Sequence, residues 1–150
     1  MPQSLSNILI HFIFSTKTRK PFIRSEISLD LYNYMAGIAR SHGSNAYEIG
    51  GVEDHVHLLL SLPRILAPSK LVEEIKKSSS KWVKTQGHLY NNFEWQKGYG
   101  AFSIGQSNFS AVRNYIQNQQ EHHKKMSFQD EYRTFLKKYG VAFDEKYVWD

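Results

Sequence analysis

The spacing of apolar residues along the chain predicts strands in four regions. Residues 7–14 are apolar on both sides of an extended chain apart from His11, which is typical of a strand at the centre of a sheet. Residues 45–51 and 55–62 are two apolar-rich runs joined by a short glycine-containing turn, and they predict a hairpin. Residues 93–105 combine aromatic residues with three glycines and predict one or two short strands.

Apolar residues recur at helical spacing in four further segments. The first helix is predicted for residues 26–42, before Gly43, and the second runs from residue 69 to about residue 86. Residues 107–125 and 128–139 predict two more helices near the end of the chain.

The order of these elements, β-α-β-β-α-β-α-α, predicts an α+β fold in one domain, residues 1–150. The order fits a ferredoxin-like split βαβ arrangement, an antiparallel sheet with helices on one face and added C-terminal helices. In such a sheet the first and third strands are neighbours in the middle.

The composition favours one class of binding partner and excludes several kinds of chemistry. The chain has 19 Lys and Arg against 14 Asp and Glu, and the formal net charge of +5 favours a polyanion such as nucleic acid. The absence of Cys excludes disulfides, zinc–thiolate sites and thiol nucleophiles. No apolar run approaches the roughly 18 residues that a membrane helix needs. The N-terminus also lacks a secretory signal, so we expect a cytoplasmic protein with no membrane partner.

Two histidines share one face of the strand predicted for residues 55–62. Side chains alternate along a strand, so His55 and His57 point to the same side while Val56 and Leu58 enter the core. Two imidazoles at this spacing can bind one metal ion or one phosphate oxygen. Taken alone, the pair is more typical of two structural histidines.

A tyrosine and a glutamine share one face of the third predicted helix. Tyr115 and Gln119 are four residues apart, and His122 continues the same face. A hydroxyl nucleophile and an amide oxygen would then point the same way. The alternative is that Tyr115 belongs to the packing face, three residues after Val112, and that Gln119 is solvated.

Lysines form a stripe on the second predicted helix and cluster again in the loop that precedes the first. The stripe consists of Lys70, Lys77, Lys81 and Lys84, which fall within an arc of about 60° on a helical wheel, and Glu73 and Glu74 are expected to lie off it. Such a stripe can follow a phosphate backbone, or it can simply favour solubility. The residues we expect to contact nucleic acid are Lys17, Arg19, Lys70, Lys77, Lys81 and Lys84.

Taken together, these motifs resemble a known family. The chain resembles the single-tyrosine HUH transposases (His, hydrophobe, His) of the insertion-sequence-200-like type, which are related to the REP-associated tyrosine transposases. The resemblance covers nearly the whole chain and runs through five segments in the same order. They are residues 10–19, 54–59, 79–82, 93–103 and 115–123.

The resemblance implies a site and a reaction. It implies that His55 and His57 bind a divalent metal, Mg²⁺ or Mn²⁺, that Gln119 is the third ligand, and that Tyr115 is the nucleophile. The expected reaction cleaves and rejoins single-stranded DNA at insertion-sequence ends through a 5′-phosphotyrosine intermediate, without a nucleotide cofactor. The expected partners are single-stranded DNA with hairpin ends and a second copy of the chain, in a homodimer at the nucleoid of a prokaryote.

Two other functions fit parts of the sequence. A non-catalytic single-stranded nucleic-acid-binding module on the same sheet would bind DNA without forming a covalent product. A metal-dependent hydrolase unrelated to DNA is disfavoured because the sequence shows no acidic ligands to accompany the His pair.

Overall fold

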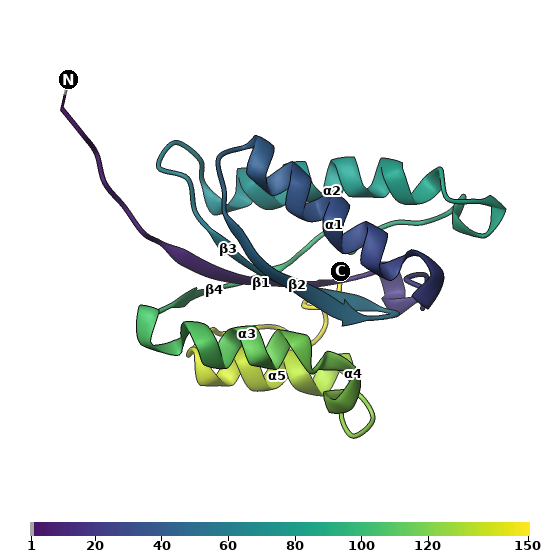
Figure 1. Ribbon diagram of the computed structural model, residues 1–150. Helices are drawn as coiled ribbons and strands as arrows, with labels where there is room; N and C mark the ends of the chain where they lie inside the picture. Colours follow the sequence, from purple (N-terminus) through teal and green to yellow (C-terminus); the bar gives the residue numbers. More distant parts are fainter. Residues whose placement is uncertain (1) are drawn as a thin grey trace.

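The chain folds around one four-stranded antiparallel sheet in the computed structural model, which describes residues 2–150 (Figure 1). The strands are β1 (Leu9–Ser15), β2 (Ala46–Val52), β3 (His55–Ser61) and β4 (Gly100–Ile104). Their order across the sheet is β2-β3-β1-β4, and every pairing is antiparallel. The central position of β1 and β3 confirms the ferredoxin-like split βαβ prediction.

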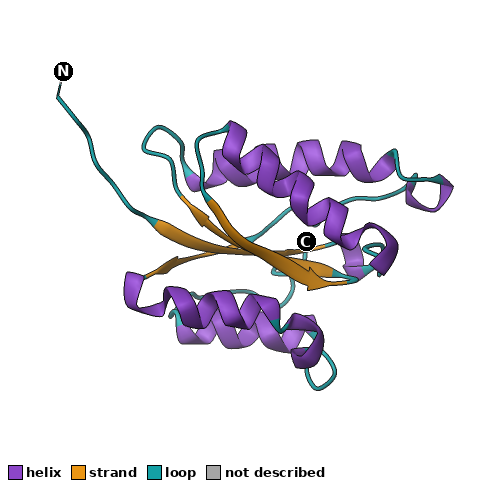
Figure 2. Ribbon diagram, viewed as in Figure 1, coloured by secondary structure: helices purple, strands orange, loops and turns teal. Residues whose placement is uncertain are grey.

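Helices cover both faces of the sheet (Figures 1 and 2). The long helices α1 (Ser25–Ser41) and α2 (Pro68–Lys84) lie on one face, as predicted. The added C-terminal helices form a separate layer on the opposite face. They are α3 (Phe109–Gln117), α4 (Gln119–His122) and α5 (Phe128–Lys138). Short 3-10 helices, η1 (Lys17–Arg19), η2 (His88–Tyr90) and η3 (Gln106–Asn108), lie in the connections.

The structure corrects one sequence prediction and narrows another. The single helix predicted for residues 107–125 is interrupted at Asn118, whose φ of −103° and ψ of 23° separate α3 from α4. Asn is a weak helix former, so the chain can bend there at low cost. Residues 93–105 contain only one strand, β4, preceded by an isolated bridge between Thr16 and Trp95.

The alternating faces of the central strands enter different cores. On the α1–α2 face, Phe12 and Leu58 pack against buried helix residues such as Leu31 and Ile75. On the opposite face, Ile13 packs with buried residues of β4 and α5, namely Phe102, Phe128, Tyr132 and Leu136. Because both faces are covered, β1 is buried along its whole length, as its continuous apolar pattern predicts. None of the helices within residues 2–150 is long and apolar enough to span a membrane.

Candidate metal and tyrosine site

Strand β3 holds His55 and His57 on the face covered by the C-terminal helices. Both side chains are completely buried, and their ring centroids lie 5.2 Å apart. Val56 and Leu58 point to the α1–α2 core, as the alternation predicts. The strand therefore presents two imidazoles together in a site that is screened from solvent.

Each of these imidazoles is oriented from behind by a second side chain. The Nδ1 atom of His55 lies 2.7 Å from Oδ1 of Asp54, and Nδ1 of His57 lies 2.8 Å from Nε2 of His11. The Nε2 atoms of both rings are thereby turned towards the C-terminal helices. Partners that fix the orientation of a ligand histidine in this way are typical of metal sites. His11, the one polar interruption of β1, thus supports the site without belonging to its centre.

A buried carboxylate from α5 meets both imidazoles. Oε1 of Glu131 lies 2.9 Å from Nε2 of His57 and 3.2 Å from Nε2 of His55. The same oxygen is 3.1 Å from Nε2 of His123, which follows α4. Glu131 has no exposed surface, so four groups from three parts of the chain meet in one enclosed cluster.

The predicted nucleophile and third ligand reach the same cluster. The Tyr115 hydroxyl donates a hydrogen bond to Oε2 of Glu131, and Nε2 of Gln119 donates to that oxygen at 3.1 Å. Oε1 of Gln119 faces Nε2 of His55 at 3.0 Å. The break at Asn118 does not separate the two residues, since both lie on the site. His122 stacks on the Tyr115 ring, with centroids 4.3 Å apart.

Burial and mutual contacts determine the charges in the cluster. Burial by itself lowers the pKa of His55, but hydrogen bonds to Asp54 and Glu131 outweigh it and raise that pKa to about 9. Burial opposes ionisation of Glu131, yet His57 and the hydrogen-bonding imidazoles hold its pKa well below the ordinary range. Burial and the Glu131 carboxylate raise the pKa of Tyr115. The imidazoles thus favour the ionised form of Glu131, and that carboxylate in turn favours the neutral form of the phenol.

The donor set suits a metal ion. His55, His57, His123 and Glu131 each offer one ligand atom, and these atoms lie within 4.8 Å of one another. Nε2 of His123 is buried and contacts Oε1 of Glu131 at 3.1 Å without hydrogen-bond geometry, so it faces the same cluster.

Sequence reasoning missed Glu131 and His123. Glu131 lies 74 residues from His57 and follows no recognised spacing, so only folding reveals that it joins the His pair. His123 lies in the segment 115–123 that carries the family resemblance. Helical spacing from Tyr115 and Gln119, however, places its neighbour His122 on their face. The expectation that no acidic group accompanies the His pair is wrong, because α5 carries Glu131 into the site.

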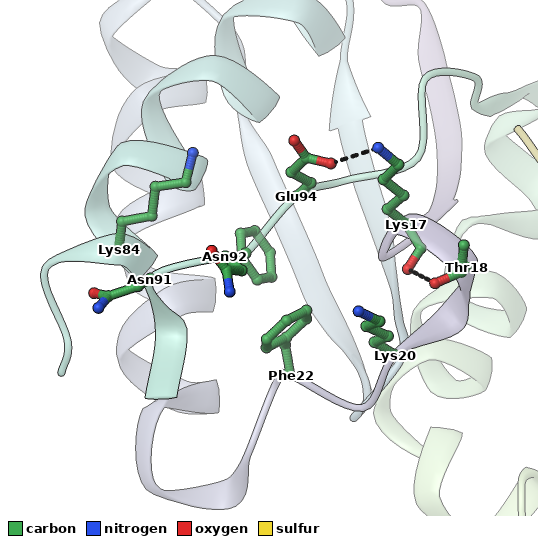
Figure 3. A pocket seen from close by; sticks show the side chains of 9 residues that line it. Lys17, Thr18, Lys20, Phe22, Lys84, Asn91, Asn92 and Glu94 are labelled. Carbon is green, nitrogen blue, oxygen red and sulfur yellow. Dashed lines mark hydrogen bonds and ion pairs between the residues drawn. The ribbon is translucent and has the colours of Figure 1, made fainter. Parts of the chain in front are cut away.

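Two adjoining pockets lie beside the basic loop after β1. One has a volume of about 490 Å³ and is lined by Lys17, Lys20, Lys84 and Phe22 among others; Figure 3 shows Lys17 paired with Glu94 on one side and Lys84 on the other. The second, of about 810 Å³, also contains Lys17 and Lys84. We call these two pockets the basic groove.

The predicted nucleic-acid contacts are distributed unevenly around the basic groove. Lys17, Lys77 and Lys84 line it, and further cations there are Lys76 and Lys97. The guanidinium of Arg19 lies 5.8 Å from the ring centroid of Trp149, a lining residue, whereas Lys70 and Lys81 do not line either pocket. The expectation that acids lie off the lysine stripe is also wrong.

Glu74 sits between two lysines of that stripe. Its Oε1 atom is 3.2 Å from Nζ of Lys70 and 3.3 Å from Nζ of Lys77. One turn of an α-helix brings residues three and four apart together, so a single acid pairs with both. Lys84 is the stripe residue in both pockets, and the stripe as a whole is less positive than its lysines alone suggest.

Comparison with known proteins agrees with this fold. The family model described as IS200-like transposase matches residues 4–119, which include His55, His57, Tyr115 and Gln119. The chain therefore belongs to the IS200-like transposase family.

Individual relatives are distant. The chain is 23% identical over 116 residues to the ISDra2 transposase TnpA of Deinococcus radiodurans, a match that covers 74% of this chain and 83% of that protein. A crystal structure of a protein from Deinococcus radiodurans, described as a transposase, superposes with a TM-score of 0.61 at 20% identity, covering 79% of this chain and 98% of the other. A REP-associated tyrosine transposase bound to a REP hairpin gives a TM-score of 0.61 at 15% identity, over 82% and 72%.

A glycine on β2 allows the tyrosine helix to approach the sheet. Gly50 pairs with His57, and a Cβ atom there would lie 2.9 Å from the carbonyl oxygen of Ile116, next to Tyr115 in α3. We predict that Gly50→Ala displaces α3 and lowers the free energy of unfolding by about 1–3 kcal/mol in urea denaturation. Gly37→Ala is the matched control, because a Cβ there meets nothing within 4 Å. It should raise stability by about 0.4–1 kcal/mol. Equal effects of the two changes would contradict the close approach.

Proposed function

We propose that this protein is a transposase that cleaves and rejoins single-stranded DNA at insertion-sequence ends, with Tyr115 as the nucleophile. The observation that carries the proposal is the position of the Tyr115 hydroxyl, which shares the Glu131 carboxylate with His55 and His57. A buried tyrosine hydroxyl always needs a hydrogen-bond partner, and here that partner is the carboxylate that both histidines also contact. Membership of the IS200-like transposase family supports the same reading.

The proposed reaction conserves the free energy of the cleaved phosphodiester bond in a covalent link between tyrosine and DNA. The Tyr115 oxygen loses its proton and attacks the scissile phosphorus, forming a 5′-phosphotyrosine link while the 3′ oxygen leaves and takes up a proton. The reverse attack by a 3′-hydroxyl rejoins DNA and frees the tyrosine, so neither water nor a nucleotide cofactor is consumed. His55, His57 and Gln119 would hold a divalent ion, Mg²⁺ or Mn²⁺. When bound, such an ion offsets the charge that develops on the phosphate oxygens.

The supporting side chains have distinct tasks in this proposal. Asp54 and His11 keep the two imidazoles facing the reaction centre. The helices of the second layer exclude water, which strengthens every electrostatic interaction in the site. His122 stacks on Tyr115 and limits the rotation of its ring.

The basic groove is suited to single-stranded DNA. The basic groove includes Lys17 and Thr18 of the loop after β1, and the preceding Thr16 donates its backbone N–H to the carbonyl of Asp54, the residue before His55, at 2.9 Å. Exposed cations attract phosphates, and accessible aromatic rings can stack on unpaired bases. The related REP-associated transposase is bound to a hairpin, which supports hairpin DNA as the substrate class here.

The number of subunits in the protein can be tested directly. The homodimer implied by the family resemblance remains a prediction, as does a cytoplasmic location at the nucleoid. Sedimentation with and without hairpin DNA distinguishes a dimer from a monomer.

Changing the proposed nucleophile should separate chemistry from binding. We predict that Tyr115→Phe abolishes the covalent protein–DNA adduct formed with single-stranded DNA and Mn²⁺ in a denaturing gel, because it removes only the attacking oxygen. Hairpin binding should change less than about threefold. Tyr47→Phe, another helix-packed tyrosine, is the control and should retain the adduct. An adduct that persists in Tyr115→Phe would refute the assignment, and binding without any adduct in the unmodified protein would indicate the non-catalytic binding module.

Removing cations from the groove should weaken the salt dependence of DNA binding. We predict that Lys77→Ala with Lys84→Ala reduces the slope of log affinity against log salt by about 1.4, since each phosphate contact to a single strand contributes about 0.7. The control is Lys125→Ala with Lys137→Ala, which removes the same charge from exposed positions outside both pockets. Identical slopes in the two double variants would exclude the groove as the DNA path.

A further inference from the structure

We propose that Glu48 is a positioning residue for Tyr115. A β-bulge on β2 turns the Glu48 carboxylate towards α3, where it fixes the rotation of the tyrosine helix relative to the sheet. The inference rests on the proposed function in taking Tyr115 as the nucleophile. It adds a residue of the sheet, outside the cluster of imidazoles and Glu131, that determines where the nucleophile lies.

The bulge directs two consecutive side chains of β2 to the C-terminal layer. The pairing register shifts between Ala46 and Glu48, so β2 has one residue, Tyr47, more than β3 over this stretch. Such an extra residue changes the direction of the side chains next to it. The Tyr47 ring packs edge-on against Phe109, and the Glu48 side chain reaches the same helix, α3. Regular alternation would send one of the two to the α1–α2 core, where Ala46 and Ile49 pack.

Glu48 accepts two hydrogen bonds from one face of α3. Its Oε1 atom accepts from Nε of Arg113 at 3.2 Å and from Nε2 of Gln117 at 2.9 Å. These two donors are four residues apart, so they are neighbours on the helix surface, and Tyr115 lies between them along the chain. The Glu48 side chain is 22% exposed, which screens the pair only in part. Turning α3 by one residue, about 100°, would carry both donors away from the carboxylate.

Apolar packing alone leaves the rotation of α3 weakly determined. In the part of the chain that the structure describes, Ile116 is the one buried residue of this helix. Its close approach to Gly50 sets the distance between helix and sheet, but apolar contact is non-directional. Hydrogen bonds are directional, so those to Glu48 supply the missing constraint. A partly exposed ion pair contributes little to global stability, and its effect should therefore be local to α3.

The rotation of α3 decides where the Tyr115 oxygen lies. The hydroxyl meets the Glu131 carboxylate from one side of the helix, while Arg113 and Gln117 meet Glu48 from another. A helix transmits such a constraint over a few residues because its backbone is rigid. Attack by a held nucleophile is sensitive to a displacement of about 1 Å. Glu48 thus acts on the reaction through α3 and not on the reacting atoms.

Amide hydrogen exchange tests the contact without DNA or metal. In Glu48→Ala we expect the amides of residues 113–117 to exchange at least about threefold faster than in the unmodified protein, because α3 loses two directional hydrogen bonds. Amides of β1 should keep their rates. The matched control is Glu145→Ala, which removes another glutamate paired with an arginine, Arg133 of α5, at 2.6 Å. The control should leave exchange in α3 unchanged. Unchanged exchange in α3 of Glu48→Ala would overturn the proposal.

Exchanging the two charges separates positioning from folding. At saturating hairpin DNA with Mn²⁺, we expect Glu48→Arg and Arg113→Glu each to slow formation of the covalent adduct at least about fivefold, because each sets like charges against one another. The double variant restores opposite charges and should return the rate to within about twofold. Gln117 suits either arrangement, since an amide both donates and accepts. A double variant as slow as the single variants would contradict a direct pair.

The two measurements fail independently. Saturating DNA removes differences in affinity from the adduct rates, so these rates report the position of the nucleophile. If the unmodified protein forms no adduct, the proposed function fails, and hydrogen exchange still decides whether Glu48 holds α3. An adduct that forms at the ordinary rate in both single variants would leave the proposed function standing and remove Glu48 as a positioning residue.

Discussion

The antiparallel pairing of β1 with β3 in the middle of the sheet is the contact on which the site depends. It sets Ser15 opposite His55 and Ile13 opposite His57, with a helical layer over each face. Histidines on an exposed or edge strand would be hydrated. Here they are withdrawn from water, so protein groups or a bound ion must satisfy their nitrogens.

The second helical layer provides the partners of the two Nε2 atoms and brings Tyr115 to the site. Helix α5 is anchored by a cluster of aromatic and aliphatic side chains, whereas α3 has only Ile116 fully buried and depends on Gly50 for its close approach. The carboxylate therefore comes from the better anchored helix and the tyrosine from the more lightly anchored one. This difference favours α3 and α4 as the part of the site that adjusts when DNA enters, with Glu131 as the fixed point.

Charge is arranged differently inside and outside the molecule. The enclosed cluster holds one carboxylate among imidazoles, while the groove beside the basic loop carries lysines, several of them moderated by Glu74 and Glu94. These lysines are only partly neutralised, so they attract a polyanion, whose phosphates can replace the acids as ion-pair partners. In the proposed mechanism, a divalent ion at the enclosed cluster, rather than lysine, would offset the charge of the phosphate. A fixed ion suits an attack on phosphorus better than a surface of mobile ammonium groups does.

The sequence alone determined the features that follow from local periodicity. Alternation on residues 55–62 placed both histidines on one face, four-residue spacing placed Tyr115 with Gln119, and continuous apolar character made β1 central. The tertiary structure decided which distant groups meet. Glu131 and His123 joined the His pair because the C-terminal helices fold back over the sheet. Periodicity specifies the direction of a side chain from its own backbone, whereas the partner it meets depends on packing across the whole chain.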